Sequence, residues 1–341
     1  MWCVSLMTFA VGLLLLETAA RFLYLAPPPL EQAARRYVRD PWLPFKPLPL
    51  STNAGRSVTR EFDYLYVHNS QGFRDVEYPL AKPAGIFRIL VLGDSFTYGV
   101  GARSEETYPS QLAGLLNQRG ASHPRIEIIN TGIPRYWTEP ERALLEHYGL
   151  KYAPDLVLVA FCPNDVLDTF CGRDDVIISD YGYMITRDAA KLGPTALFLY
   201  EHSGICRILL RRYVASQRSN RPLPRLDEIY RADGFHEKDW RAIEAEFGRM
   251  SELCRSNNAR LVLVHLPGGG FEERKSYPAR RLSEWCANHQ TQFIDILPAM
   301  KKASAGGVPL YYEKDGHCRP AGYRVVAQTL FNELVEAGSV P

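Results

Sequence analysis

The sequence predicts an α/β protein in which a parallel sheet of about five strands lies between two layers of helices. Two observations indicate this fold class. From residue 86 onward, short apolar runs alternate with segments of helical periodicity, and this alternation is typical of a three-layer α/β/α sandwich. Within each run the apolar residues are continuous rather than alternating, so we expect helices to cover both faces of the strands.

Five apolar runs are expected to form the sheet. The first of them ends in Gly93, where the chain should turn from a strand into a helix. Such runs are long enough for ordinary strands and too short for most helices. The five runs cover residues 86–92, 126–129, 156–161, 261–266 and 293–297.

Four segments between and after these runs have the spacing of amphipathic helices. In the third segment, Ile243, Phe247 and Met250 fall on one helical face. The second begins with Thr138 and Glu141 at capping-box spacing. The four predicted helices cover residues 107–118, 138–148, 240–254 and 321–335.

A long insertion interrupts this alternation. Residues 168–237 separate two core elements, although a crossover connection needs only about a dozen residues. We expect this insertion to be a lid or a substrate-binding cap, with a helix over residues 196–213. That helix carries Arg207, Arg211 and Arg212. A solvated basic edge is the favoured interpretation of these arginines, and a membrane-surface role is the alternative.

The N-terminus is strongly apolar. Residues 1–16 carry no charge, and the apolar sequence continues to residue 26 with interruptions at Glu17 and Arg21. Residues 1–26 together reach the length of about 20 residues needed to span a bilayer, and Arg21 could extend to the membrane surface. A cleavable signal peptide fits less well, because no basic segment precedes the apolar run. We therefore predict a membrane anchor rather than a buried helix of the globular domain.

The segment after the predicted anchor is rich in proline. Seven prolines lie between residues 27 and 50, so we expect residues 27–60 to form a semi-rigid stalk. A single hydrolase-like domain should then cover residues 61–341. Arg35, Arg36 and Arg39 follow the anchor, and the positive-inside rule would place them in the cytoplasm. That orientation would also place the domain that follows these arginines in the cytoplasm.

Composition excludes several functions. The formal net charge is +2, and 23% of the residues are charged, so no basic field suggests nucleic-acid binding. The seven cysteines are scattered without a CxxC pair, which argues against a zinc site or a thioredoxin-like motif. We expect neither a metal nor a cofactor.

The strongest local signal for catalysis is the sequence Gly-Asp-Ser-Phe-Thr-Tyr-Gly over residues 93–99, directly after the first predicted strand. A serine hydroxyl is a poor nucleophile near neutral pH and needs a base within hydrogen-bonding reach. A turn from a strand into a helix exposes the side chain and offers free backbone N–H groups to a developing negative charge. Ligands of open parallel sheets also bind at this edge. Ser95 is therefore the candidate nucleophile.

Three further polar residues are expected at the same edge. Asn164 follows the third predicted strand and supplies a side-chain amide. Asp315 and His317 stand in the sequence Lys-Asp-Gly-His just before the last predicted helix. His317 could act as the general base, and Asp315 could fix its tautomer and stabilise the imidazolium. A serine, an amide, a carboxylate and an imidazole in these positions together indicate acyl-transfer chemistry.

These motifs, in this order, resemble those of the SGNH/GDSL hydrolase superfamily over residues 86–335, and that superfamily has a flavodoxin-like sheet. Residues 93–95 resemble its first block, whose serine is the nucleophile, and residues 130–135 resemble its second. Residues 164–165 resemble the third block, and residues 315–317 the fifth. The resemblance implies an oxyanion hole formed by the Ser95 N–H, the Asn164 amide and a backbone N–H of the second block.

The sequence departs from the family pattern in three places. Arg135 stands where the second block usually has its oxyanion glycine, so Arg135 and Gly132 are both candidates for that N–H group. Cys162 replaces the usual glycine of the third block. The acid and the base have D-x-H spacing instead of D-x-x-H. This last spacing resembles a branch associated with polysaccharide O-acetylation in the bacterial envelope, whose members often have an N-terminal membrane anchor.

We predict a serine-dependent ester hydrolase or acyl transferase that forms an acyl-enzyme on Ser95. The expected substrates are O-acyl groups of envelope carbohydrate or lipid, and the resemblance implies an extracytoplasmic catalytic domain, periplasmic or extracellular. Water as acceptor gives an esterase or deacetylase, whereas a sugar hydroxyl gives an O-acyltransferase. The alternative is a catalytically inactive module of the same fold that binds glycan, because fold alone does not establish activity.

Three other polar residues have simpler interpretations. His265 ends the fourth predicted strand and could face the site. We favour a structural role instead, in which its hydrogen bonds are satisfied at the edge of the core. His68 should pack against the sheet rather than act in catalysis. Asp94 should stabilise the turn that carries Ser95.

Overall fold

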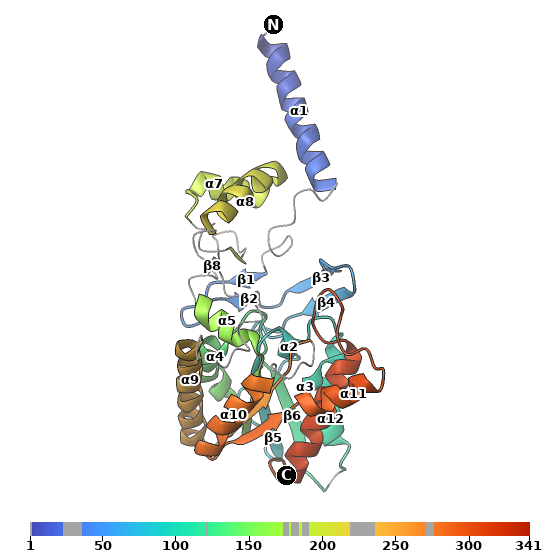
Figure 1. Cartoon of the computed structure of the whole chain (residues 1–341), viewed down its shortest axis with the longest axis vertical. Coiled ribbons are helices and arrows are strands. Elements are labelled where there is room, and N and C mark those ends of the chain that lie inside the picture. The colour runs from blue at the N-terminus through green and yellow to red at the C-terminus, as the bar shows by residue number, and fades with distance from the viewer. Residues whose placement is uncertain are drawn as a thin grey trace. The chain divides into compact units, whose positions relative to one another are not determined.

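The computed structural model forms two compact units, which are described separately. It describes residues 2–22, 36–120, 122–172, 177–178, 184–185, 191–218, 236–269 and 276–341. One unit contains residues 1–46 and 171–223, and the other contains residues 47–170 and 224–341 (Figure 1). The second unit holds the sheet and all of the candidate catalytic residues.

Five parallel strands form the central sheet of this second unit, as predicted. Their order is β11-β10-β7-β5-β6, so the chain adds β6 on one side of β5 and β7 on the other. This reversal creates a switch point at the carboxyl ends of β5 and β7, where open α/β sheets bind their ligands. The strands are β5 (Ile86–Gly93), β6 (Arg125–Asn130), β7 (Leu156–Phe161), β10 (Arg260–His265) and β11 (Gln292–Asp295).

Helices cover both faces of the sheet. Ile89 and Val91 of β5 belong to one apolar cluster with Leu112 and Leu330 from the helices on that face. On the other face, the ring of Phe161 lies 6.1 Å from the ring of Phe247. The first face is covered by α3 (Tyr108–Asn117), α11 (Leu297–Ala305) and α12 (Pro320–Glu336), and the second by α4 (Thr138–His147), α9 (Glu237–Ser256) and α10 (Tyr277–Asn288) (Figure 1).

The continuous apolar runs are explained by this double coverage. All six residues of β7 are buried, and burying one large aliphatic side chain stabilises the fold by roughly 1.5–3 kcal/mol. The predicted capping box at Thr138 and Glu141 is wrong. Trp137 is the N-cap residue of α4 and makes no side-chain capping bond. Glu141 is instead buried, because it lies on the face of α4 that packs inward.

The second unit begins earlier than predicted. Residues 52–67 form an antiparallel hairpin of β3 (Thr52–Arg56) and β4 (Asp63–Val67), so the end of the predicted stalk, residues 27–60, belongs to the unit that holds the sheet. The shorter elements of this unit are α2 (Ser95–Tyr98), η1 (Ser104–Glu106), η2 (Gly149–Tyr152) and α5 (Asn164–Cys171).

The other unit contains α1 and part of the insertion. The helix predicted over 196–213 is two helices, which are separated at Ser203. Glu17 of α1 accepts hydrogen bonds from the N–H groups of Gly204 and Ile205, at 2.7 and 3.1 Å, and so caps the second of them. The elements are α1 (Trp2–Phe22), β1 (Tyr37–Val38), β2 (Lys46–Pro47), β8 (Ile177–Ile178), β9 (Met184–Ile185), α7 (Pro194–His202) and α8 (Gly204–Arg218).

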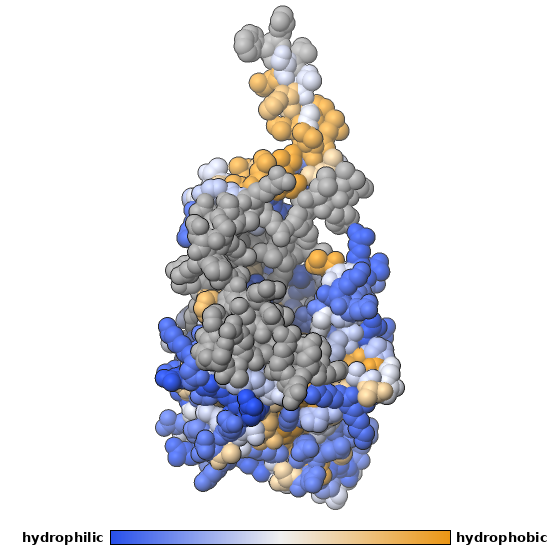
Figure 2. All heavy atoms as spheres, viewed as in Figure 1, coloured by the Kyte–Doolittle hydropathy of each residue, from blue (hydrophilic) through white to orange (hydrophobic). Residues whose placement is uncertain are grey.

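The apolar side chains of α1 are largely exposed. Leu6, Met7 and Phe9 are 75%, 66% and 68% exposed, and Figure 2 shows hydrophobic residues gathered on this helix. Nevertheless, no helix in the described ranges is both long enough and apolar enough to cross a membrane. The last residues of the predicted anchor, 23–26, and parts of the insertion over 168–237 lie outside the described residues.

Candidate active site

Ser95 lies on the turn from β5 into the short helix α2. Asp94 is the N-cap residue of this helix, and its Oδ1 atom accepts the Phe96 N–H at 2.9 Å. Gly93 allows the turn to pass close to the helix, because a Cβ atom there would meet Thr97 Oγ1 at 2.1 Å. Ser95 remains partly exposed, so its hydroxyl is available at the carboxyl edge of the sheet.

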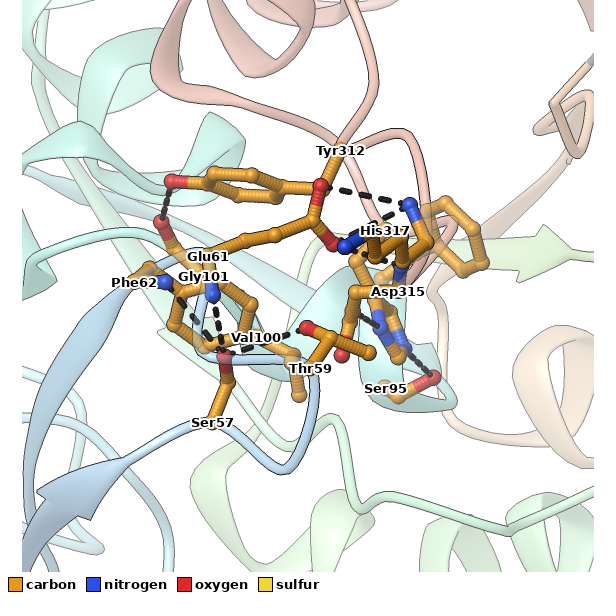
Figure 3. A network of polar contacts seen from close by, with 12 residues as sticks. Ser57, Thr59, Glu61, Phe62, Ser95, Val100, Gly101, Tyr312, Asp315 and His317 are labelled. Carbon is orange, nitrogen blue, oxygen red and sulfur yellow. Dashed lines mark hydrogen bonds and ion pairs between the residues drawn. The ribbon is translucent and has the colours of Figure 1, made fainter.

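The imidazole of His317 faces Ser95. Its Nε2 atom lies 2.8 Å from Ser95 Oγ across a sequence separation of 222 residues. Its Nδ1 atom lies 2.5 Å from Asp315 Oδ1 on the same loop (Figure 3). The structure therefore brings together the serine, imidazole and carboxylate that the motifs predicted.

Asp315 is suited to hold the imidazole. Partial burial raises its pKa, but the hydrogen bond and charge of His317 outweigh that effect and hold the pKa of Asp315 below its ordinary value. The carboxylate is therefore ionised near neutral pH and accepts the proton on Nδ1 of His317. This leaves Nε2 as the atom that can accept a proton from Ser95.

The side-chain amide of Asn164 reaches the site but is engaged twice. Its Nδ2 atom donates to Asp94 Oδ2 at 3.0 Å and to Asp168 Oδ2 at 3.1 Å. An amide nitrogen has two protons, so neither points freely toward a bound acyl oxygen in this arrangement. Asp168 was not recognised in the sequence, although its position one helical turn after Asn164 places the two side chains on one face of α5.

The backbone N–H groups predicted for the oxyanion hole differ in availability. The Gly132 N–H donates to Asn130 Oδ1 at 3.0 Å, so it is already used. Among the described residues, the N–H groups of Ser95 and Arg135 have no hydrogen-bond acceptor. Arg135 has a φ of +66°, a conformation that favours glycine and accounts for the glycine usual at this position.

The third block is closely packed around Cys162. This side chain is 2% exposed and belongs to the apolar core. Burial raises the pKa of its thiol well above the ordinary value, so the sulfur stays protonated. Cys162 is therefore a small apolar side chain here and not a second nucleophile.

Three acidic side chains of this unit are buried. Asp94, Glu141 and Asp165 are each 1% exposed. Burial raises the pKa of all three above their ordinary values, and the charges of neighbouring acids add to this effect for Glu141 and Asp165. Burial therefore favours the protonated form of each of these carboxyl groups. No metal-binding group of three acidic, cysteine or histidine side chains occurs in the part of the chain that the structure describes.

The two competing histidines have other partners. His265 is fully buried, and its Nδ1 atom lies 2.8 Å from Asp295 Oδ1. His68 is also buried, with Nε2 2.9 Å from the Tyr98 hydroxyl. Neither contact involves Ser95.

Arg74 and Glu61 are two contributors that the sequence did not reveal. Arg74 is buried and donates to the carbonyls of Tyr98, Gly99 and Ala102 at 3.0, 2.7 and 2.7 Å. These carbonyls lie at the end of α2 and in the turn after it, so Arg74 fixes the end of this helix. Glu61 contacts the loop that carries His317. Both residues precede the first predicted strand, where no periodicity pointed to the site.

Comparison with known proteins gives one clear assignment. The sequence profile of the GDSL-like Lipase/Acylhydrolase family matches residues 91–325, a range that contains Ser95, Asn164, Asp315 and His317. No curated protein sequence matches the chain.

Several solved structures are similar at low identity. TesA is 15% identical with a TM-score of 0.43, and the match covers 72% of this chain and 97% of that one. A putative lipolytic protein of the G-D-S-L family from Desulfitobacterium hafniense is 16% identical with a TM-score of 0.42, covering 72% and 99%. A variant of an acetylxylan esterase from Geobacillus stearothermophilus is 15% identical with a TM-score of 0.43, covering 73% and 94%. The family profile covers more than half of the present sequence, so the chain belongs to the GDSL-like lipase/acylhydrolase family.

Proposed function

We propose that the protein is a serine-dependent ester hydrolase or acyl transferase that forms an acyl-enzyme on Ser95. The observation that carries this proposal is the unbroken hydrogen-bonded series from Asp315 through His317 to Ser95, at 2.5 and 2.8 Å. The same three groups in this order activate a serine hydroxyl in unrelated folds.

The geometry supports a two-step reaction. In the first step Ser95 Oγ attacks the acyl carbonyl carbon while His317 Nε2 takes the hydroxyl proton. The imidazolium, stabilised by Asp315, then gives this proton to the leaving alcohol as the C–O bond breaks. In the second step His317 removes a proton from the acceptor, whose oxygen attacks the acyl carbon. The bond between this carbon and Ser95 Oγ then breaks, and His317 returns the proton to Ser95.

The negative charge that develops on the acyl oxygen needs hydrogen-bond donors. We assign this role to the backbone N–H groups of Ser95 and Arg135, which have no acceptor among the described residues. The Asn164 amide would join them once it releases Asp168. Gly132 is the weaker candidate, because Asn130 already uses its N–H group.

The acceptor decides between the two activities. Water gives an esterase or deacetylase, and a sugar hydroxyl gives an O-acyltransferase. We propose O-acyl groups on envelope carbohydrate or lipid as substrates, and the support for this class is the D-x-H spacing of Asp315 and His317.

We also propose that the protein is membrane-associated, with its catalytic unit on the extracytoplasmic side. The exposed apolar side chains of α1 support membrane association, and the D-x-H resemblance supports the side. Fractionation of cells that make the full chain, followed by protease treatment of intact cells or spheroplasts, tests both parts. Recovery of the protein in the soluble cytoplasm would contradict them.

A glycan-binding module without catalytic activity is the alternative function. It is favoured by the doubly engaged amide of Asn164, which leaves the oxyanion hole incomplete in this arrangement. Such a module would bind acylated oligosaccharide without releasing acyl groups.

Hydrolysis of p-nitrophenyl acetate by the full chain tests the proposal. We expect turnover by the wild type and a loss of at least about 10³-fold in Ser95→Ala. Addition of an oligosaccharide acceptor distinguishes transfer from hydrolysis, because transfer increases the mass of the oligosaccharide by one acyl group, as measured by mass spectrometry. A folded wild type that binds oligosaccharide but turns over no ester would favour the alternative.

A further inference from the structure

The loop that carries the acid and the base is closed by its own backbone. The Tyr312 N–H donates to the His317 carbonyl at 2.9 Å, and the Gly316 N–H donates to the Tyr312 carbonyl at 3.1 Å. The three N–H groups of residues 313–315, at the tip of this loop, do not take part in this closure. Successive N–H groups of this kind form an anion-binding nest.

The carboxylate of Glu61 occupies this nest. Its Oε1 atom accepts the N–H of Glu313 at 2.9 Å, and its Oε2 atom accepts the N–H of Asp315 at 2.8 Å (Figure 3). The N–H of Lys314 lies 3.2 and 3.1 Å from the two oxygens. Three consecutive backbone groups therefore bind one side chain that lies about 250 residues earlier in the sequence.

The position of Glu61 is itself fixed by the β3–β4 hairpin. The N–H groups of Glu61 and Phe62 donate to Ser57 Oγ at 3.0 and 3.3 Å, and the Ser57 N–H donates to the Phe62 carbonyl at 2.8 Å. The Phe62 ring lies 4.7 Å from the Tyr312 ring, and the Tyr312 hydroxyl donates to the Gly101 carbonyl at 2.8 Å. The tip of the hairpin and the loop thus contact each other through an aromatic pair as well as the nest.

We propose that Glu61 is a positioning residue for the reaction assigned to Ser95, acting through Asp315 and His317. Its bond to the Asp315 N–H fixes the main chain from which the Asp315 carboxylate reaches Nδ1 of His317. That contact in turn directs Nε2 toward Ser95. Without Glu61 the three N–H groups would bind water and the loop could shift, and a displacement of about 1 Å can cost about 10²-fold in rate.

The charge state of Glu61 agrees with this role. Desolvation raises its pKa, but hydrogen bonds from the N–H groups of Lys314 and Asp315, from Thr59 and from Glu313 leave the pKa of Glu61 below its ordinary value. Glu61 is therefore a carboxylate near neutral pH, and both of its oxygens can accept hydrogen bonds.

Replacement of Glu61 in the full chain tests the proposal, with Asp63 as a matched control. Asp63 is an acid on the same hairpin whose partner is Arg56, at 3.6 Å, and not the catalytic loop. We expect Glu61→Ala to lower kcat on p-nitrophenyl acetate about 10- to 100-fold, with KM changed by no more than about twofold. Glu61→Gln keeps one acceptor oxygen and should lose less. Asp63→Ala should behave as the wild type.

A double-variant cycle separates positioning from general stabilisation. If Glu61 acts through Asp315, Glu61→Ala combined with Asp315→Asn should be hardly slower than Asp315→Asn alone. Effects that multiply in the double variant would overturn the proposal, as would a kcat in Glu61→Ala within about twofold of the wild type.

A spectroscopic readout does not depend on turnover. The proton between His317 Nδ1 and Asp315 should give a low-field ¹H resonance that is lost or shifted in Glu61→Ala and retained in Asp63→Ala. A resonance unchanged in Glu61→Ala and Glu61→Gln would overturn the proposal. The wild type could also lack esterase activity while its resonance still depends on Glu61. That result would contradict the proposed function but not the positioning role of Glu61.

Discussion

The side-chain nitrogen of Asn164 lies 3.1 Å from the carboxylate of Asp168, one turn further along α5. The other proton on this nitrogen goes to Asp94, at 3.0 Å. Asp168 thus accepts an N–H that the proposed reaction would use to stabilise the oxyanion. In that reaction, substrate binding would exchange this hydrogen bond for one to the acyl oxygen.

Removal of Asp168 should therefore help the reaction. We expect Asp168→Ala to raise kcat on a short acyl ester about 2- to 10-fold at pH 8, which corresponds to the net contribution of one hydrogen bond. Steady-state kinetics measure this change, and Asn164→Ala is the control, with an expected loss of about 10²- to 10³-fold. A lower kcat in Asp168→Ala would show that Asp168 positions the amide rather than competing for it.

Asp168 should also make stability depend on pH. Burial raises its pKa to about 6 from the ordinary value of 3.8, so the folded state binds this proton more tightly than the unfolded chain. Its contribution is present in full at low pH and is lost as the pH rises through about 6.

Asp168→Asn should remove this loss of stability at higher pH, because an amide does not titrate. Between pH 5 and pH 8, the free energy of unfolding should fall more in the wild type than in this variant, by roughly 1–1.5 kcal/mol. Urea unfolding of both proteins at the two pH values measures the difference. Equal pH dependence in the two proteins would rule out a raised pKa at Asp168.

The two residues beside Ser95 should differ in the size of their effects. In the proposed reaction His317 exchanges a proton with Ser95, so His317→Ala should lose nearly as much activity as Ser95→Ala. Asp315→Asn should lose about 10²- to 10⁴-fold, because the carboxylate only holds and stabilises the imidazole. His265→Ala serves as the control, since that ring contacts Asp295 instead. Greater damage from His265→Ala than from His317→Ala would refute this assignment.

Gly132 should tolerate no side chain. A Cβ atom at this position would lie 2.4 Å from the backbone nitrogen of Tyr98 and 2.7 Å from the carbonyl carbon of Thr97. Both atoms belong to the nucleophile helix, so Gly132→Ala must displace α2 or the second block. We expect a lower melting temperature together with a loss of activity, measured by calorimetry and ester hydrolysis. A wild-type melting temperature and wild-type activity would mean that α2 and the second block can move apart without any effect on stability or activity.

The sheet could be predicted from the sequence because its signal is local. All six residues of β7 are buried, and a run such as Leu-Val-Leu-Val-Ala-Phe reports that burial directly. Ser95, Asp315 and His317 could be found for a related reason, since strand ends and helix starts carry recognisable motifs. The helices α10 and α11 and the β3–β4 hairpin were not predicted, because their apolar residues follow weaker patterns.

The supporting residues depend on contacts between distant segments. Glu61 reaches the catalytic loop across more than 250 residues, and Arg74 reaches the end of α2 by contacts to carbonyl groups that no side-chain pattern encodes. The bond between Asn164 and Asp168 spans only one helical turn. The motif of the third block covers residues 164–165 alone, so it does not predict this bond.

Covalent labelling tests whether Ser95 is the nucleophile, by intact-protein mass spectrometry after treatment with a fluorophosphonate. We expect one adduct on the wild type, located at Ser95 by peptide mapping and formed much more slowly in His317→Ala. A folded Ser95→Ala protein should carry no adduct. An adduct that persists in Ser95→Ala, or a folded wild type that is never labelled, would show that Ser95 is not the nucleophile.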